Sequence, residues 1–202
     1  MQKEVTKSWA LFIGIGIIMI AHGLQMQLMG IRSDVENFSV ITTGIFMSGY
    51  FTGYFLGSKT TPQLVQKVGH IRVFAAFASL ASLSALLAAV YVNPIMWTLS
   101  RFITGISLVS CYIVTESWLN DRATNKNRGQ LLSAYFIILY IGLAIGMLLL
   151  NVSDPKNYEP FILVSILLSL ALVPILLTKR SAPKFKKIGT VSVKELFEIS
   201  PL

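Results

Sequence analysis

Arg101 is the one formal charge inside the long apolar runs of this chain, and it is the strongest candidate for binding chemistry. A guanidinium stays charged at neutral pH and donates up to five hydrogen bonds. In hydrocarbon such a group is costly, so it needs a partner, water or a ligand. We expect Arg101 to bind an anion or a coupling group in a central cavity. The alternative is a structural arginine that bonds backbone carbonyls or extends to the membrane surface.

His22 is the second candidate, because an imidazole titrates near neutral pH. It could carry a proton or hydrogen-bond a substrate, and the alternative is a neutral histidine bonded inside the bundle. Gln25 and Gln27 follow closely but point to different faces of a helix, so at most one of them accompanies His22. We assign Gln25 to the cavity together with Arg101 and His22.

A second set of polar residues lies where the apolar runs end. Gly69 and Arg72 precede the third run, Glu116 follows the fourth, and Arg128 precedes the fifth. An ion pair between Glu116 and either arginine is worth only about 0–1 kcal/mol when exposed. Partly desolvated and networked, it would favour one conformation over another. We therefore predict a cytoplasmic gate, with simple anchoring at the membrane surface as the alternative.

Small residues recur at helical spacing in two runs. Gly49, Gly53 and Gly57 stand four residues apart, and Gly142 and Gly146 repeat this spacing. Small residues at such intervals allow helix backbones to approach closely. We assign these glycines to helix packing and not to substrate binding.

Six apolar runs must position these side chains. Each has about 17–22 residues, which is the length needed to cross roughly 30 Å of hydrocarbon as a helix. We predict an all-α membrane protein whose residues 1–178 form a six-helix transmembrane bundle, followed by a basic cytoplasmic linker at 179–202 that ends before a seventh span. The predicted spans are 9–30, 39–56, 73–91, 95–115, 131–150 and 161–177.

Positive charge gives the orientation. Of the 17 Lys and Arg residues, fourteen lie in the termini and the even-numbered loops, and only Arg32 and Lys156 lie in the odd-numbered loops. The positive-inside rule then places both termini on the cytoplasmic side of the membrane, which we expect to be a bacterial inner membrane. Because the net charge of +8 follows this topology, we expect no nucleic-acid partner. Cys111 is the only cysteine, which excludes an intrachain disulfide and a cysteine-based metal site.

The two halves of the bundle show a related pattern. Spans one to three and four to six run in opposite orientations, and each group carries its polar cluster in its first helix at similar depth. This is the arrangement that an inverted three-plus-three repeat produces.

Several motifs together resemble the amino-terminal half of a major facilitator superfamily transporter, across nearly all 202 residues. The loop after the second span carries Gly53-Tyr-Phe-Leu-Gly57 and Val68-Gly69-His70-Ile71-Arg72, without the acidic residue usual in that family. The fourth span carries Arg101-x-x-x-Gly105. The stretches Glu116-Ser-Trp-Leu-Asn and Asn127-Arg128-Gly129-Gln-Leu-Leu are similar to the uncharacterised YcaD-type branch.

The resemblance implies a secondary active transporter of a small solute that works by alternating access between two six-helix halves. This chain would be the first half, a fragment whose partners are the lipid bilayer, a small-molecule substrate, a coupled proton and the missing carboxy-terminal half. A second copy of the chain is the alternative partner. Substrate, coupling ion and direction of transport stay open.

Two other classes of membrane protein share features with this chain. A six-helix substrate-binding membrane subunit of an energy-coupled importer has a similar length, and it would bind its ligand without a second half. An intramembrane serine protease would need a Gly-x-Ser-Gly sequence and a histidine on another helix, whereas Ser48 lacks the leading glycine. No phosphate-binding loop is present. We expect no enzymatic activity, no cofactor and no metal.

Overall fold

The computed structural model describes residues 8–177, and 87% of this part is helical with no strands. The predicted linker at 179–202 and the approach to a seventh span lie outside the described residues. The helices are α2 (Trp9–Val35), α3 (Val40–Val68), α4 (His70–Val90), α5 (Pro94–Arg122), α6 (Arg128–Leu149), η1 (Leu150–Val152), α7 (Glu159–Leu170) and α8 (Leu172–Leu176).

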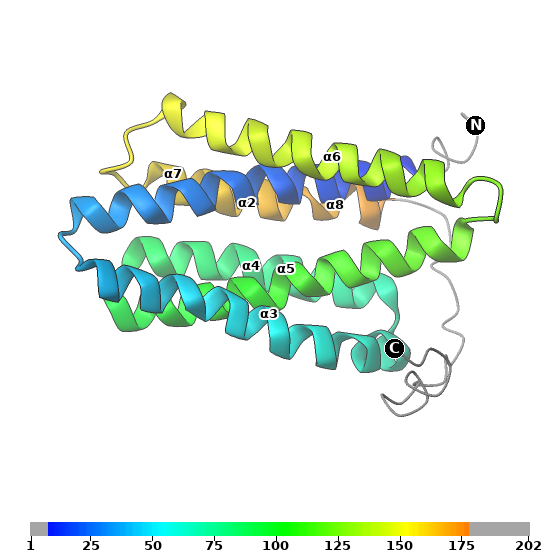
Figure 1. Cartoon of the computed structure of the whole chain (residues 1–202), viewed down its shortest axis with the longest axis horizontal. Helices are drawn as coiled ribbons and strands as arrows, with labels where there is room; N and C mark the ends of the chain where they lie inside the picture. Colours follow the sequence, from blue (N-terminus) through cyan, green and yellow to red (C-terminus); the bar gives the residue numbers. More distant parts are fainter. Residues whose placement is uncertain (1–7, 178–202) are drawn as a thin grey trace, which may run out of the picture.

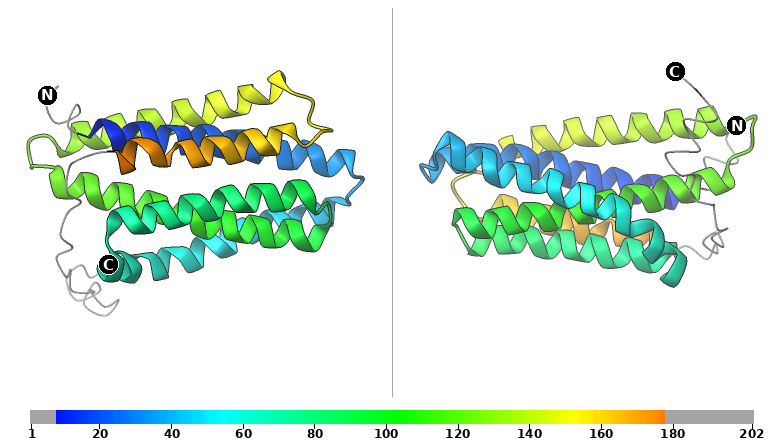
Figure 2. Two further views of the ribbon diagram at one scale, coloured as in Figure 1. Left: turned by 180° about the vertical axis from the view of Figure 1, so that it is seen from behind. Right: turned by 60° about the horizontal axis from the view of Figure 1, so that its bottom comes forward.

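The helices run roughly parallel to one long axis and form two groups of three (Figure 1). In one group α3 and α4 pack on α5, and in the other α6 and the α7–α8 segment pack on α2. The two groups meet mainly through α4 and α7, which lie together on the far side of Figure 1 and come forward in the left view of Figure 2. The two groups therefore have the same internal packing.

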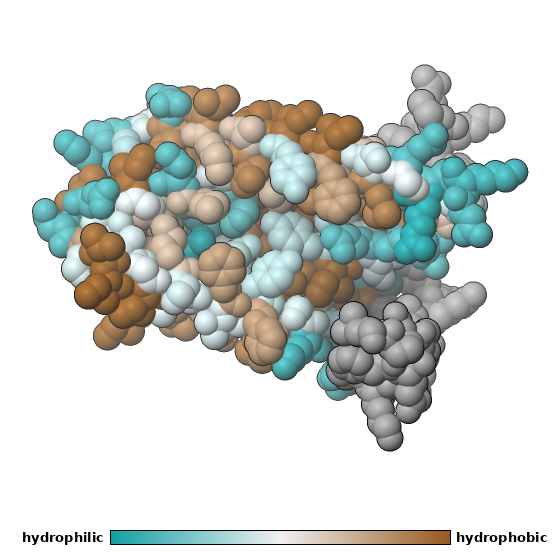
Figure 3. All heavy atoms as spheres, viewed as in Figure 1, coloured by the Kyte–Doolittle hydropathy of each residue, from teal (hydrophilic) through white to brown (hydrophobic). Residues whose placement is uncertain are grey.

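Five of the helices in the described part of the chain are long and apolar enough to cross a membrane: α2, α4, α5, α6 continued through η1, and α7 with α8. Hydrophilic side chains gather at the two ends of the long axis, with mostly hydrophobic side chains between them (Figure 3). The sequence predicts six spans, and α3 is the one that does not meet the composition of a membrane helix. It has 29 residues, but serines, threonines and glycines recur along it.

Two predicted spans continue as helices well beyond the apolar runs. The run at 39–56 becomes α3, which ends at Val68, and the run at 95–115 becomes α5, which ends at Arg122. Hydropathy changes at the membrane surface, but nothing in the polar residues that follow ends the helix there. Gly69 ends α3 with a φ of 88°, a left-handed conformation that favours glycine.

The last predicted span, 161–177, is interrupted. Ala171 separates α7 from α8, and Pro174 lies inside α8. Proline has no N–H, so the carbonyl of Leu170 loses its usual helical partner at this point. The interruption is therefore a local consequence of Pro174 and does not change the direction of the segment (Figure 1).

Glycines make the contact between α3 and α5 very close. A Cβ on Gly53 would collide with the carbonyl oxygen of Phe102, and one on Gly105 would collide with the carbonyl oxygen of Tyr50. A Cβ on Gly49 would lie 2.9 Å from the Thr98 oxygen. The two backbones are thus in direct contact, as small residues in membrane helices permit.

The α2–α6 pair is built in the same way. A Cβ on Gly146 would collide with the Ile20 carbonyl oxygen, and one on Gly142 would lie 2.9 Å from the Gly16 oxygen. From the other side, Gly23 lies against the Leu143 carbonyl. Each group of three helices therefore contains one glycine-mediated backbone contact.

Candidate functional site

Tyr50 of α3 brings together the two residues that the sequence singles out most strongly. Its ring stacks on the imidazole of His22 from α2, with centroids 5.5 Å apart and planes 18° apart. The Arg101 guanidinium of α5 lies over the same ring, with Cζ 4.8 Å from the centroid. Three helices thus contribute one residue each to a cluster in the interior of the bundle.

The Arg-x-x-x-Gly spacing on α5 has a structural reason. Gly105 stands one turn after Arg101 and lets the α3 backbone approach at Tyr50. Because Arg101 and Gly105 share a face of the helix, the Tyr50 side chain meets Arg101 where its own backbone meets Gly105. A larger residue at position 105 would displace the ring that contacts the guanidinium.

Arg101 is only 3% exposed, and its Nε and Nη1 atoms are buried without a hydrogen-bond partner among residues 8–177. It also makes no ion pair within this part of the chain. The Nδ1 atom of His22 is likewise buried without a hydrogen-bond partner. The site therefore contains a cation and a ring nitrogen with unused hydrogen-bonding capacity.

Gln25 lies one turn after His22 and connects to a separate hydroxyl cluster. Its Nε2 atom lies 3.5 Å from the Thr104 hydroxyl, and the Ser84 and Thr104 hydroxyls are 2.9 Å apart. Ser100 donates to the backbone oxygen of Ser84 at 2.7 Å. These contacts join α2, α4 and α5, so Gln25 has a structural hydrogen bond beside any role in a cavity.

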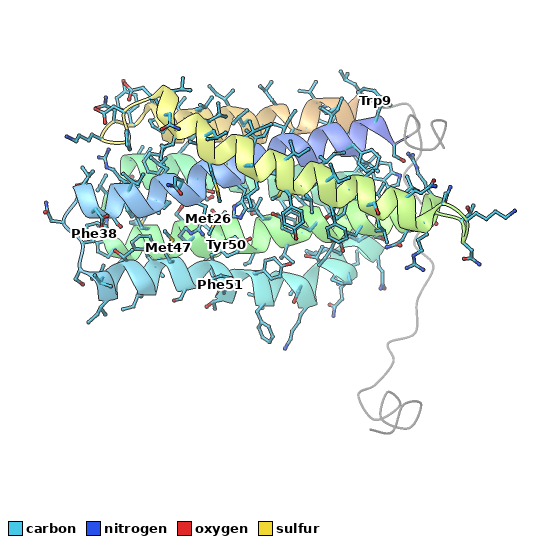
Figure 4. The ribbon with its side chains drawn as sticks, turned by 45° about the horizontal axis from the view of Figure 1, so that its top comes forward. Trp9, Met26, Phe38, Met47, Tyr50 and Phe51 are labelled. Atoms are coloured by element: carbon cyan, nitrogen blue, oxygen red, sulfur yellow. The ribbon has the colours of Figure 1, made fainter. Side chains whose placement is uncertain are left out.

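Methionine and tyrosine side chains also lie on the three helices that form the cluster. The Tyr112 hydroxyl lies 3.1 Å from the Met19 sulfur, joining α5 to α2. Met26, one turn after His22, is 48% exposed, and Met47, one turn before Tyr50, is partly buried. Figure 4 shows Met26, Met47 and Tyr50 near one another between α2 and α3.

At the other end of α5, Glu116 has a neutral partner. The Tyr135 hydroxyl of α6 donates to its Oε1 atom at 3.1 Å. Arg72 and Arg128 are exposed, and in the described part of the chain neither forms an ion pair with Glu116. Gly69, the fourth predicted gate residue, has a backbone role at the junction of α3 and α4.

Arg32 joins two loops at the end of the bundle opposite Glu116. Its guanidinium pairs with Glu36 at 2.6 Å and donates to the backbone oxygens of Pro155, Lys156 and Asn157. The loop after α2 is thereby tied to the loop before α7. The sequence places Glu36 four residues after Arg32, but it gives no signal for the contact with the loop before α7.

Tyr50 is the site residue that sequence reasoning missed. A tyrosine in an apolar run is ordinary, and the available signal was its position beside Gly49 in the glycine repeat. That repeat predicts which face of α3 meets another helix, but it does not predict which residue of the other helix lies opposite. Among residues 8–177, no three His, Cys, Asp or Glu side chains are grouped so as to hold a metal ion.

Known proteins match this chain over nearly its whole length. A family model described as Major Facilitator Superfamily matches residues 9–199. The uncharacterized MFS-type transporter YcaD of Escherichia fergusonii is 24% identical over 189 residues, which cover 94% of this chain and 50% of that protein. The protein of the same name in Escherichia coli O6:K15:H31 is 28% identical over 189 residues, with the same coverage. The chain spans about half the length of these curated relatives.

Proposed function

Since the chain belongs to the Major Facilitator Superfamily, we propose that it forms the amino-terminal half of a secondary transporter that moves a small solute by alternating access. The observation that carries this proposal is the family match over residues 9–199, combined with relatives that are about twice as long. The chain is an integral membrane protein, and we place it in a bacterial inner membrane. A carboxy-terminal half would complete the transporter.

The packing of the helices supports an inverted three-plus-three repeat. In such a repeat α2, α3 and α4 correspond in order to α5, α6 and α7. The contact between α3 and α5 then corresponds to the contact between α6 and α2. In the same way, the packing of α4 on α5 corresponds to the packing of α7 on α2. Both glycine-mediated contacts obey this exchange. In this proposal α3 also crosses the membrane, parallel to α5 and antiparallel to α2 and α4, and both termini are cytoplasmic.

Arg101, His22 and Gln25 are proposed to face the solute pathway. In support, the first two carry buried polar atoms without partners and meet at Tyr50, which is what a binding site awaiting its ligand requires. Arg72, Glu116, Arg128 and Gly69 are proposed for the cytoplasmic gate. The Tyr135–Glu116 hydrogen bond would then belong to one conformation, and an ion pair of Glu116 with an arginine to another.

Cysteine accessibility tests the topology. In a Cys111→Ala background of the complete protein, Lys126→Cys lies in the loop between α5 and α6, and Lys156→Cys lies in the loop before α7. We expect a membrane-impermeant thiol reagent to label Lys156→Cys in intact cells, and Lys126→Cys only after permeabilisation. The opposite pattern would refute the orientation, and labelling of both in intact cells would refute the six-span arrangement.

A second reporter tests alternating access. Met26→Cys is half-exposed and lies near the proposed site, so a transporter should present it to each side of the membrane in turn. We expect impermeant reagent to label it in both right-side-out and inside-out vesicles, with Cys111→Ala alone as the unlabelled control. Labelling from one side only would favour a substrate-binding subunit that has no transport cycle of its own.

A further inference from the structure

We propose that the cluster around Tyr50 binds an organic anion, with the anionic group on Arg101 and an apolar body against Tyr50, Met26 and Met47. This inference deepens the transporter proposal and rests on it for the direction from which the ligand arrives. It assigns a substrate class to the site, and it assigns Tyr50 a positioning role.

The charge of Arg101 calls for an anionic ligand. In the part of the chain that the structure describes, it makes no ion pair, and Glu116, on the same helix, lies fifteen residues away, which is about 22 Å along the axis. A buried cation without a counter-charge is strongly unfavourable. An anionic ligand supplies that charge, whereas a cationic ligand would be repelled.

The unused hydrogen bonds of the site also call for an anionic ligand. The Nε and Nη1 atoms of Arg101 are buried and donate to no described residue, and the buried Nδ1 atom of His22 also has no hydrogen-bond partner there. A buried donor without an acceptor costs about 1–3 kcal/mol, and more when the donor is charged. Carboxylate or other oxyanion oxygens are acceptors that suit a guanidinium. The site thus offers both the charge and the donors for one oxyanion group.

Tyr50 holds these groups in place. Its ring, which is 8% exposed, contacts the guanidinium at 4.8 Å and the imidazole at 5.5 Å. Cation–π contacts of this kind contribute about 0.5–2 kcal/mol, according to how far the pair is desolvated. The phenol therefore limits the orientations of Arg101 without neutralising its charge, which leaves the guanidinium available to an anion.

The surroundings define the rest of the ligand. Met26 and Met47 lie one turn from His22 and Tyr50 respectively, and a Cβ on Gly30 would lie 4.0 Å from Met47 Cε. Methionine adapts its shape to apolar groups and contacts aromatic rings favourably. Methionine side chains cannot replace the hydration of a small inorganic anion, whereas the burial of an apolar group against them is favourable. The site therefore favours an organic anion over inorganic phosphate or chloride.

Three probes that share one ring separate charge from shape. We would titrate the purified complete protein in detergent with benzoate, benzamide and benzylammonium, and also with inorganic phosphate, and follow its thermal unfolding and heats of binding. We expect benzoate alone to raise the unfolding temperature. Arg101→Gln should weaken benzoate binding at least tenfold, whereas Arg32→Gln, at an arginine in the last turn of α2, should leave it unchanged.

Several results would overturn the inference: benzoate without effect, benzamide equal to benzoate, phosphate stronger than benzoate, or unaltered benzoate binding in Arg101→Gln. If Arg101→Gln does not fold, the variants Tyr50→Phe and Tyr50→Leu are used in its place. Tyr50→Phe keeps the aromatic ring and should keep benzoate binding. Tyr50→Leu removes the ring and should weaken benzoate binding severalfold. Equal affinities in these two variants would overturn the positioning role. The Met26→Cys accessibility experiment uses no ligand, so its failure would reject the transport cycle without rejecting anion binding.

Discussion

Replacing Gly53 by alanine should weaken the bundle, because the contact between α3 and α5 leaves no room for a methyl group. A Cβ at this position would collide with the Phe102 carbonyl oxygen and lie 2.9 Å from its carbonyl carbon and 3.1 Å from the Ile106 nitrogen. All three are backbone atoms, so no side-chain rotation relieves the contact. The helices must separate by about 1 Å to relieve the contact with the oxygen, which we expect to cost about 1–3 kcal/mol, as overpacking does elsewhere.

Gly44 provides a matched control on the same helix. A Cβ there would meet nothing within 4 Å, so Gly44→Ala adds the same methyl group without a contact. Alanine is also favoured over glycine in a helix by about 1 kcal/mol. We therefore expect Gly44→Ala to be neutral or stabilising where Gly53→Ala is destabilising.

Reversible unfolding of the complete protein in mixed micelles, followed by tryptophan fluorescence as the denaturing detergent increases, would measure the difference. The expected result is a lower midpoint for Gly53→Ala and an unchanged or higher midpoint for Gly44→Ala. Equal midpoints for the two variants would refute the argument that backbone contact holds α3 against α5.

Two further predictions concern individual hydrogen bonds. Tyr135→Phe removes the donor to Glu116 and should lower the free energy of unfolding by about 0.6 kcal/mol, the average for such bonds in membrane proteins, and by no more than about 1.7 kcal/mol. Tyr140→Phe, at a tyrosine that is 69% exposed on the same helix, should leave it unchanged. Equal losses in the two variants would show that the bond to Glu116 is not what stabilises α6. Arg32→Ala releases the loop at 153–158 from the loop after α2, so amide hydrogen exchange in that loop should accelerate at least tenfold, and unchanged exchange would mean that the loop is ordered by other contacts.

Local sequence was sufficient to locate the helices and to predict the family. Apolar runs long enough to cross a bilayer predict helices because hydrocarbon leaves backbone groups no other partner. Each run coincides with a helix, with no more than one residue beyond a helix end, and the helix of the last run is interrupted at Ala171. The resemblance drawn from the stretches at Arg101 and Arg128 agrees with the family match over residues 9–199. The far ends of α3 and α5 were missed because hydropathy reports the membrane surface and not the end of a helix.

What the sequence could not determine is which residues meet. The sequence predicts an ion pair of Glu116 with Arg72 or Arg128. In the structure its partner is the Tyr135 hydroxyl, because the packing of α6 brings that ring to α5. Arg101 and His22 were both evident, but only the close contact of α3 with α5 places Tyr50 against them. Composition and periodicity act along a single helix, so they determine its length and its faces. The contacts between helices depend on where small residues allow two backbones to touch, and the tertiary structure alone decides them.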